Sequence, residues 1–387
     1  MQVSNSKPHI VFTLPACMGG AASFNYNIIN FSKLIKKFHS KVILLKAKED
    51  TRHLFTDVFK ADEVATFNFS YKENNYYTQQ RLNEMIGNHE GAIVTDNALT
   101  IQAACRFNNP KTVFHLIHDF FYVNQNIESG NLVDVAVAHS SFFKDAIFAA
   151  DPLVFSGRGF YIPYGVQQLK KMPVKNNAVL KLVFLGRLDE GKGVLQLHEI
   201  NQLLLLQNIN ADWSIIGKGP LKKKIREQWA NNKNVQFLEH DTTNEVYALL
   251  QQQDIFVFPT SFEGTPVSIL ESLANGVVTI VNDLPGGIRD IVQEGIGFRC
   301  AFNDINSFAS HIATLHHNRD MLNKMQQHCY DLSNMEYNID VNADNYFKLF
   351  LQYNQFKRSK KNTPIPMSRL DKKIFPNGLV KTIRGFK

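Results

Sequence analysis

The segment FVFPTSFEGTPVSILESLANGVVTIVNDLPGGIRDIV, residues 256–292, alternates apolar runs with loops rich in glycine and proline. This pattern predicts a buried strand, a loop, a helix, a second buried strand and a second glycine loop. Where a loop runs directly into a helix, the first backbone N–H groups lack intrahelical acceptors and lie at the positive end of the helix dipole. The segment therefore predicts an anion-binding site at the N–H groups of Thr265, Val267 and Ser268.

Two glutamates eight positions apart lie on either side of this predicted anion site. Glu263 is in the loop, and Glu271 is about a turn and a half into the expected helix. Carboxylates in these places can accept hydrogen bonds from a ligand whose phosphate docks between them. Both could equally be solvated surface carboxylates, and the segment alone leaves the two interpretations open. The segment contains no G-x-G-x-x-G and no G-x-x-x-x-G-K-[ST], which counts against dinucleotide and P-loop sites.

The bulk composition is that of a globular protein with more than one domain. The chain has 387 residues, of which 44% are hydrophobic and 20% charged, and this length favours two domains. The four cysteines have neither metal-type nor redox-type spacing, so we expect reduced core residues in a cytoplasmic protein and no zinc site. No apolar run is long enough for a membrane helix. The cysteines are Cys17, Cys105, Cys300 and Cys329.

The positive charge is concentrated at the C-terminus. The net charge is +7, but residues 356–387 contain ten Lys or Arg and one acid, a net of +9, so the remaining 355 residues carry −2. This basic tail is either a disordered solubilising end or a segment attracted to an anionic membrane surface. Nucleic acid binding is not expected, because no platform of aromatic and basic residues accompanies it in the body of the chain.

Apolar runs alternate with helical patterns along both halves of the chain. Strands that are apolar almost throughout and alternate with helices predict a parallel sheet covered on both faces. The first-half strands are expected at residues 9–14, 41–46, 63–67, 92–96, 112–117 and 133–138, with helices at 21–38, 78–87 and 98–107. The second-half strands are expected at 181–185, 213–216, 235–238 and 255–258, with helices at 194–207, 220–230, 244–251, 306–332 and 339–356.

This repeat predicts an α/β protein with two Rossmann-like domains that face an interdomain cleft. The expected boundaries are residues 1–166 for the first domain, a linker at 167–177, 178–335 for the second domain, a helix at 339–356 and the basic tail at 357–387. Ligands in such folds bind at the carboxyl ends of the strands.

Three further loops follow predicted strands and are candidates for that cleft. Met18 precedes Gly19 and Gly20, two positions without side chains that permit close approach of a ligand or form a structural turn. His118 follows the strand at 112–117 and is either a functional residue or a core histidine. The third loop, residues 186–193, contains Arg187 and Lys192, two cations that suit a diphosphate. The alternative is that this loop is a basic surface loop in contact with water. No D-x-D pair in a strand-end loop supports a metal site.

Taken together, these motifs resemble the retaining nucleotide-sugar glycosyltransferases of the GT-B fold, specifically glycosyltransferase family 4. The family's E-x7-E pattern matches Glu263–Glu271, and its G-R-L-x-x-x-K-G loop matches Gly186–Gly193. Its second glycine loop matches Gly286–Asp290. Further landmarks follow in order in the first half, at Gly19-Gly20, His118-Asp119, residues 138–141 and residues 162–166. The resemblance covers about the first 350 residues.

The resemblance implies a role for each matched residue. Arg187 and Lys192 would hold the diphosphate, Glu271 the ribose hydroxyls, and Glu263 the donor sugar. His118 would contact the transferring sugar. The first domain would bind the acceptor and the second the donor, without a metal cofactor. The residues implied in donor binding are Gly19, Gly20, Gly264, Thr265, Pro266, Val267 and Glu271, and the base would lie against residues 237–241.

The implied function is sugar transfer from a UDP- or GDP-sugar to a glycan or lipid-linked acceptor with retention of configuration. Lipopolysaccharide, capsule or another surface polysaccharide is the expected product. The implied location is the cytoplasm, with possible attachment to the inner face of the membrane through the tail. The alternatives are a nucleotide-sugar- or glycan-binding protein on an inactive GT-B scaffold, or a GT-B epimerase.

Overall fold

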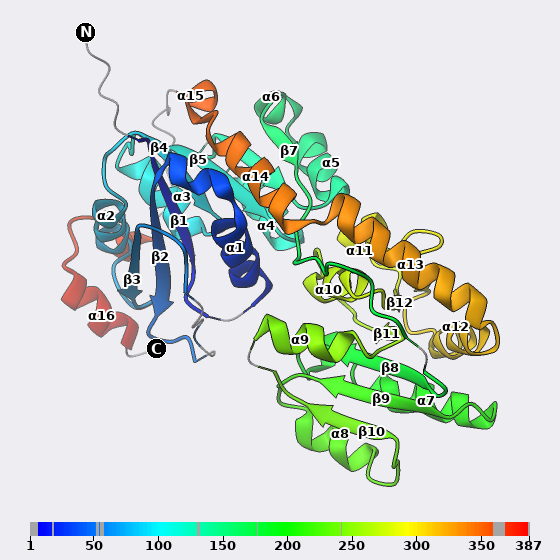
Figure 1. Cartoon of the computed structure of the whole chain (residues 1–387). Helices are drawn as coiled ribbons and strands as arrows, with labels where there is room; N and C mark the ends of the chain where they lie inside the picture. The colour runs from blue at the N-terminus through cyan, green and yellow to red at the C-terminus, as the bar shows by residue number, and fades with distance from the viewer. Residues whose placement is uncertain are drawn as a thin grey trace. The chain divides into compact units, whose positions relative to one another are not determined.

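The computed structural model describes residues 7–17, 19–51, 54, 58–129, 132–175, 177–240, 242–358 and 368–385 (Figure 1). The chain divides into two compact units. Unit 1 comprises Met1–Pro163 and Ile339–Lys387, and unit 2 comprises Tyr164–Asn338. Met18 and Asp241, both placed in candidate loops by the sequence, lie outside the described residues, as do residues 359–367, 386 and 387 of the basic tail.

Unit 1 contains, among its described residues, a seven-stranded sheet of order β3-β2-β1-β4-β5-β6-β7 in which every pairing is parallel. Strands β4, β5 and β6 are buried at every position, as expected for a sheet covered on both faces. The strands are β1 His9–Pro15, β2 His39–Ala47, β3 Glu63–Phe69, β4 Gly91–Thr95, β5 Thr112–Ile117, β6 Val135–Ala138 and β7 Gly159–Tyr161.

The helices of unit 1 come from both ends of the chain. From the first stretch they are α1 Gly20–Phe31, η1 Lys33–Lys37, α2 Asn75–Ile86, α3 Ala98–Arg106, α4 Phe120–Glu128, α5 Ser141–Ala150 and α6 Pro152–Phe155. From the second stretch they are α14 Ile339–Phe350, α15 Tyr353–Phe356, η3 Arg369–Asp371 and α16 Asn377–Gly385.

One helix expected in unit 1 was too long, and one strand was missed. The helix expected at 21–38 ends at Phe31, because Ser32 is extended and its hydroxyl accepts a hydrogen bond from the Leu34 N–H at 3.1 Å, which begins the separate turn η1. Strand β7 was missed, since it has only three residues and carries no apolar run long enough to stand out.

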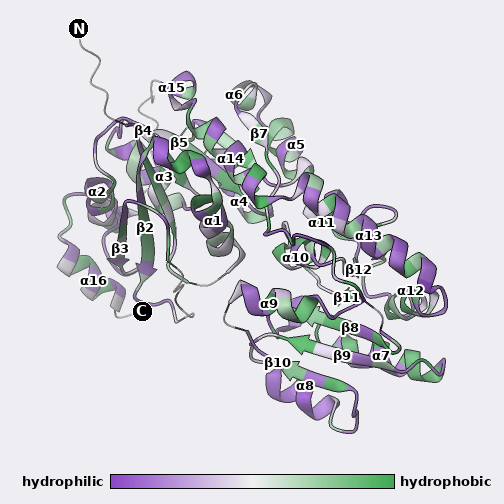
Figure 2. Ribbon diagram, in the orientation of Figure 1, coloured by the Kyte–Doolittle hydropathy of each residue, from purple (hydrophilic) through white to green (hydrophobic). Residues whose placement is uncertain are grey.

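Unit 2 contains, among its described residues, a six-stranded parallel sheet of order β10-β9-β8-β11-β12-β13. Figure 2 shows β8 and β9 as largely hydrophobic, whereas α8 at the protein surface is largely hydrophilic. The strands are β8 Leu180–Leu185, β9 Ala211–Ile216, β10 Val235–Leu238, β11 Ile255–Phe258, β12 Val278–Asn282 and β13 Gly297–Cys300. The helices are η2 Glu190–Lys192, α7 Gln196–Leu206, α8 Lys222–Gln228, α9 Thr243–Leu250, α10 Val267–Ala274, α11 Gly287–Ile291, α12 Ile305–His317 and α13 Arg319–Glu336.

Two long helices expected from the sequence are each divided. The helical stretch at 306–332 is α12 and α13, because Asn318 leaves the helical region and caps α13 through a hydrogen bond from the Met321 N–H at 2.9 Å. The helix at 339–356 ends at Phe350, and a separate turn, α15, follows it. The periodic apolar positions run through both breaks, so the pattern did not reveal them.

The segment expected as a linker, residues 167–177, packs against unit 2 where it is described. The Lys175 Nζ atom donates hydrogen bonds to the carbonyl oxygens of Gln253 at 2.6 Å and Gly276 at 2.8 Å. Burial lowers the pKa of Lys175 to about 7. The Tyr247 hydroxyl donates to the carbonyl of Gln167 at 2.7 Å. The polar groups of this stretch therefore form buried hydrogen bonds in addition to contacts with water.

Helix α14 closes the core of unit 1 with aromatic rings. Phe347 contacts Phe12 and Phe38, with ring centroids 5.9 and 6.0 Å apart, and Phe350 contacts Phe114 at 5.1 Å. The chain thus returns to its first unit after completing the second.

The described part of the basic tail is folded, which corrects the interpretation of a disordered end. Helix α16 buries Val380 completely, and η3 places Asp371 against the rest of unit 1. All four cysteines are buried, as expected of core residues. Among the described residues, no helix is both long enough and apolar enough to cross a membrane.

Candidate functional site

The centre of the candidate site in unit 2 is an ion pair between Lys192 and Glu263. Strand β11 ends at Phe258, and the loop that follows it brings the Glu263 Oε1 atom to 2.5 Å from the Lys192 Nζ atom. The Thr260 hydroxyl donates a hydrogen bond to the same oxygen at 3.1 Å. The side chains of Lys192 and Glu263 are 20% and 10% exposed, so the pair lies largely out of water but remains reachable from the surface.

Burial and charge act on Glu263 in opposite directions. Burial raises the pKa of Glu263 above its ordinary value, while the Lys192 ammonium and the Thr260 hydroxyl lower it. The charged carboxylate therefore depends on its cation and its hydroxyl donor for stability. A ligand that supplies further donors or positive charge to this carboxylate would bind favourably here.

Lys192 is held in place by the turn that carries it. The Asp189 side chain accepts a hydrogen bond from the Lys192 N–H at 3.1 Å and caps the short helix η2. Gly193 has a φ of +68°, and a Cβ atom there would lie 1.9 Å from the Pro259 carbonyl oxygen. Only glycine fits this position, which joins the lysine loop closely to the loop after β11.

Arg187 is the exposed cation of the site. Its side chain is 77% exposed, and its guanidinium contacts the Asp189 carboxylate at 3.2 Å. This exposure leaves the other nitrogen donors of the guanidinium open to a phosphate from solvent. The Asp189 carboxylate therefore contacts both cationic residues of the loop. It pairs with the Arg187 guanidinium and accepts a hydrogen bond from the Lys192 backbone N–H.

The loop that enters α10 is held by the second glycine loop. The Gly287 N–H donates to the Gly264 carbonyl at 2.9 Å, and a Cβ atom on Gly287 would lie 2.7 Å from the Thr265 hydroxyl oxygen. Pro266 is the N-cap residue, and the Ile269 N–H donates to its carbonyl at 3.1 Å. The N–H group of Val267 precedes that first bond and lies at the N-terminus of the eight-residue helix, as the sequence predicted.

Glu271 lies on α10, at the place in the helix that the sequence indicated. Burial raises the pKa of Glu271 to about 7. Burial also raises the pKa of Tyr247, and the negative charge of Glu271 adds to this rise. Glu271 is therefore a carboxyl group whose charged form is disfavoured until a ligand supplies donors such as the hydroxyl groups of a ribose.

We expect Glu271→Gln to raise the thermal stability of the ligand-free protein at pH 8. The ordinary carboxyl pKa is 4.5 and the native value about 7, so the unfolded chain loses this proton first as pH rises, and stability falls between these two values. The shift corresponds to at most about 3 kcal/mol above pH 7. Thermal unfolding between pH 4.5 and 8 would show the variant's advantage grow with pH. Glu227→Gln, at an exposed position, is the control, and an advantage independent of pH would contradict the assignment.

The predicted residues of unit 1 lie at the carboxyl ends of its strands. Gly19 is the N-cap of α1 and Gly20 its first residue, and a Cβ atom on either would meet no atom of the described residues within 4 Å. The described part of unit 1 therefore leaves room for a side chain at both positions. His118 follows β5 and is buried, with its Nε2 atom 3.5 Å from the Asp96 Oδ2 atom and its ring against Phe24.

The structure also identifies residues that the sequence analysis did not select. Thr260 and Asp189 complete the Lys192–Glu263 site, and Asp96 pairs with His118. Asp96 directly follows strand β4, so the rule that selected His118 at a strand end would also have selected it. Thr260 also lies at a strand end, two residues after β11, but this place does not mark it as a hydrogen-bond donor to Glu263. Among the described residues, no group of three or more His, Cys, Asp or Glu side chains could hold a metal ion.

Comparison with known families identifies the second unit. Residues 166–331 match the family described as Glycosyl transferases group 1. The chain is 27% identical over 217 residues to the UDP-Gal:alpha-D-GlcNAc-diphosphoundecaprenol alpha-1,3-galactosyltransferase of Escherichia coli, a match covering 52% of this chain and 55% of that protein. It is 30% identical over 152 residues to the putative colanic acid biosynthesis glycosyltransferase WcaL of Escherichia coli K12, covering 36% and 37%. The chain thus spans about half the length of the first of these relatives and less of the second.

Solved structures match nearly the whole chain. HepE of Anabaena in complex with UDP-glucose has a TM-score of 0.70 at 14% sequence identity, covering 89% of this chain and 99% of that one. Sucrose-phosphate synthase of Thermosynechococcus elongatus has a TM-score of 0.71 at 13% identity, covering 89% and 98%. These likenesses, together with the two parallel sheets, establish the GT-B fold.

Proposed function

We propose that the protein transfers a sugar from a UDP- or GDP-sugar to a glycan or lipid-linked acceptor with retention of configuration. The observation that carries this proposal is the largely buried Lys192–Glu263 pair beside the N-terminus of α10. The family match of unit 2 supports it. So does the fold shared with HepE, whose structure holds UDP-glucose.

The residues of unit 2 divide between the parts of such a donor. Lys192 and the exposed Arg187 supply positive charge to the diphosphate as the nucleotide leaves, and the N–H groups of Gly264, Thr265 and Val267 donate to phosphate and sugar oxygens. In this proposal, Glu263 stabilises the positive charge that develops on the sugar. Glu271 accepts hydrogen bonds from the ribose hydroxyl groups. In this arrangement protein cations provide the charge stabilisation of the departing diphosphate.

In unit 1 we propose that Gly19 and Gly20 leave room for the donor and that His118 contacts the transferring sugar. The open space around the two glycines supports the first role. For His118, its place after β5 and its contact with the Asp96 carboxylate support a ring held in one orientation. Unit 1 would also bind the acceptor.

The acceptor that we propose is a sugar joined through a diphosphate to a polyprenol. The E. coli galactosyltransferase acts, by its name, on alpha-D-GlcNAc-diphosphoundecaprenol. A Xanthomonas campestris relative, 27% identical over 124 residues, is named for cellobiosyl-diphosphopolyprenol. Such acceptors fit a role in lipopolysaccharide, capsule or other surface polysaccharide synthesis. They also fit a protein that works at the cytoplasmic face of a membrane.

A screen of nucleotide-sugars by thermal unfolding, followed by a transfer assay, tests the proposal. A donor that binds only the folded protein raises the unfolding temperature. We expect at least one UDP- or GDP-sugar to stabilise the protein and then to be consumed when a GlcNAc-diphospholipid is added. Stabilisation without turnover on any diphospholipid-linked sugar would favour the inactive scaffold, and conversion of the free nucleotide-sugar to its epimer would favour an epimerase.

We propose that the tail attaches the protein to an anionic membrane surface. Ile374, Leu379 and Ile383 are exposed on the folded part of the tail, near the exposed cations Lys372 and Lys373. Apolar and basic side chains together favour binding to anionic lipids, at about 1 kcal/mol for each cation near the surface.

Replacing Lys372 and Lys373 together by glutamine should weaken binding to phosphatidylglycerol liposomes about tenfold or more. Cosedimentation with liposomes measures this effect. The matched control replaces Lys223 and Lys224, two exposed lysines of α8 in unit 2. Equal binding of both double variants and the wild type would exclude the tail as the attachment site.

A further inference from the structure

A cavity of ≈ 460 Å³ lies in unit 1 at the carboxyl ends of β1, β3 and β4. This volume falls in the roughly 300–1,000 Å³ range of small-molecule sites. Its walls include the residues after β3 and β4, the starts of α2, α3 and α4, and two residues of the C-terminal segment, Asp371 and Arg384. The cavity thus combines strand ends from the first part of the chain with a wall from its last twenty residues.

One wall of the cavity carries a buried carboxylate without a hydrogen-bond donor. Asp96 is 3% exposed, and no donor among the described residues reaches either of its side-chain oxygens. The His118 Nε2 atom lies 3.5 Å from Oδ2. An unsatisfied buried carboxylate is costly, so a ligand with hydroxyl donors would stabilise this side of the cavity.

The other side chains of the cavity suit a carbohydrate. Tyr71 and Phe121 line it with rings that are 66% and 65% exposed. Gln102 and Gln125 also line it. Exposed rings offer flat apolar faces to the C–H surface of a sugar, and amides and a carboxylate match its hydroxyl groups, which both donate and accept.

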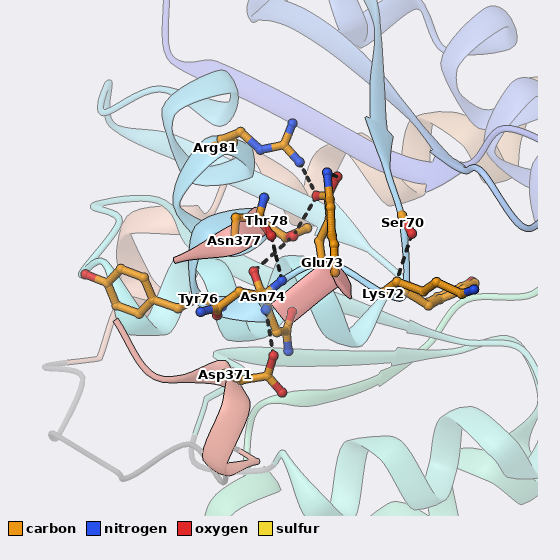
Figure 3. A network of polar contacts seen from close by, with 12 residues as sticks. Ser70, Lys72, Glu73, Asn74, Tyr76, Thr78, Arg81, Asp371 and Asn377 are labelled. Atoms are coloured by element: carbon orange, nitrogen blue, oxygen red, sulfur yellow. Dashed lines mark hydrogen bonds and ion pairs between the residues drawn. The ribbon is translucent and has the colours of Figure 1, made fainter. Parts of the chain in front are cut away.

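The C-terminal wall is anchored by Asn74, a fully buried residue at the start of α2 (Figure 3). The Asn74 side-chain amide donates to the carbonyls of Lys372 at 3.0 Å and Phe375 at 2.7 Å, and its N–H donates to the Asn377 side chain at 2.8 Å. Its Oδ1 atom meanwhile caps α2 by accepting from the Tyr76 N–H at 3.0 Å. The tail is therefore docked by specific hydrogen bonds.

The two tail residues in the cavity wall, Asp371 and Arg384, form an ion pair. The Arg384 guanidinium contacts the Asp371 carboxylate at 2.9 Å and also donates to the Glu73 carbonyl. Asp371 in turn accepts from the Asn75 N–H at 2.7 Å, at the positive end of α2. Glu73 is paired with Arg81, as Figure 3 shows, and also with Lys381 at 3.0 Å. These two cations and Arg384 offset the charges of Glu73, Asp371 and Asp96. This balanced charge suits a neutral polar ligand better than a bare phosphate.

We infer that this cavity binds the sugar of the acceptor and that the C-terminal segment, residues 368–385, forms one wall of the site through Asp371 and Arg384. The assignment of the bound sugar to the acceptor substrate rests on the proposed function. Under this inference the exposed rings of Tyr71 and Phe121 stack on the sugar, and Asp96 accepts from its hydroxyl groups. The tail then contributes to acceptor selectivity, in addition to any part in membrane attachment.

Steady-state kinetics on a GlcNAc-diphospholipid with a short lipid chain tests the inference. We expect Tyr71→Ala, Phe121→Ala and Arg384→Gln each to raise the acceptor KM about tenfold while the dissociation constant of the donor nucleotide stays within about twofold of the wild type. Phe148→Ala is the matched control, because Phe148 is a 49% exposed aromatic residue of unit 1 outside the cavity. An acceptor KM unchanged in all three cavity variants would overturn the inference and leave the proposed function intact.

Hydrogen exchange gives a readout that does not depend on turnover. The same GlcNAc-diphospholipid should slow amide exchange in peptides covering residues 70–78 and 368–385, and UDP or GDP alone should not. If the wild type transfers no sugar, the proposed function fails, but slowed exchange in these peptides would still identify a sugar site. Unchanged exchange in both peptides would overturn the site itself. Arg384→Gln should abolish the effect in residues 368–385, whereas Phe148→Ala should leave it unchanged.

Discussion

Glu263→Ala is expected to reduce sugar transfer at least about a hundredfold, while the protein remains folded and still binds the donor nucleotide. The carboxylate is the acidic group of the Lys192 ion pair, and its loss removes the negative charge proposed to lie beside the reacting sugar. The nucleotide contacts proposed for Arg187 and Glu271 remain. The loss should therefore fall on kcat, with little change in nucleotide affinity, in assays at saturating donor.

The control for this variant is Glu227→Ala, at an exposed glutamate of α8 in the same unit. It should retain the activity of the wild type. Lys192 is 20% exposed, so its ammonium can contact water once the carboxylate is removed, and thermal unfolding verifies that the variant is native. Full activity in a folded Glu263→Ala protein would disprove the proposed role of this site.

Lys192→Ala is expected to lose activity by about a hundredfold to a thousandfold and, unlike Glu263→Ala, to weaken nucleotide binding as well. The ammonium is proposed to contact the diphosphate in both the bound donor and the transition state. Its removal also leaves Glu263 without its cation, so the pKa of Glu263 should rise further. Titration calorimetry with UDP and GDP, beside the transfer assay, separates the two effects.

Lys223→Ala serves as the control for this variant, since Lys223 is a 91% exposed lysine of the same unit. The double variant of Lys192 and Glu263 should be little worse than the poorer single variant, because the two side chains act as one pair. Additive losses would show that they act independently. Nucleotide affinity equal to that of the wild type in Lys192→Ala would contradict the diphosphate role.

The local features of the site could be predicted because short-range pattern determines them. The strand β11, the helix α10 and the positions of Glu263 and Glu271 follow from apolar runs and from a glycine-rich loop before a helix. Both expected sheets are present and parallel, because the strands are apolar on both faces. The short strand β7 was missed because it carries no apolar run long enough to stand out, and the break at Asn318 was missed because the periodic apolar positions run through it.

Contacts between distant parts of the chain decided the rest. Thr260 has no local pattern that marks it as a partner of Glu263, and the hydrogen bond depends on how the loop after β11 folds back. The basic tail gave two open interpretations from its composition, yet Asn74, about three hundred positions earlier, holds it by three hydrogen bonds. Composition reports the charge of a segment but not whether another part of the chain offers donors and acceptors for its backbone.

The sequence by itself determined the α/β class, the resemblance to glycosyltransferase family 4 and the residues of the lysine and glutamate loops, because periodicity and loop chemistry are local properties. Only the tertiary structure decided that Lys192 and Glu263 form one largely buried pair. It also gave Glu271 a pKa near 7 and made the tail a wall of a cavity in unit 1. Burial and the pairing of charges depend on which distant segments exclude water from a side chain, and that is settled only when the chain has folded.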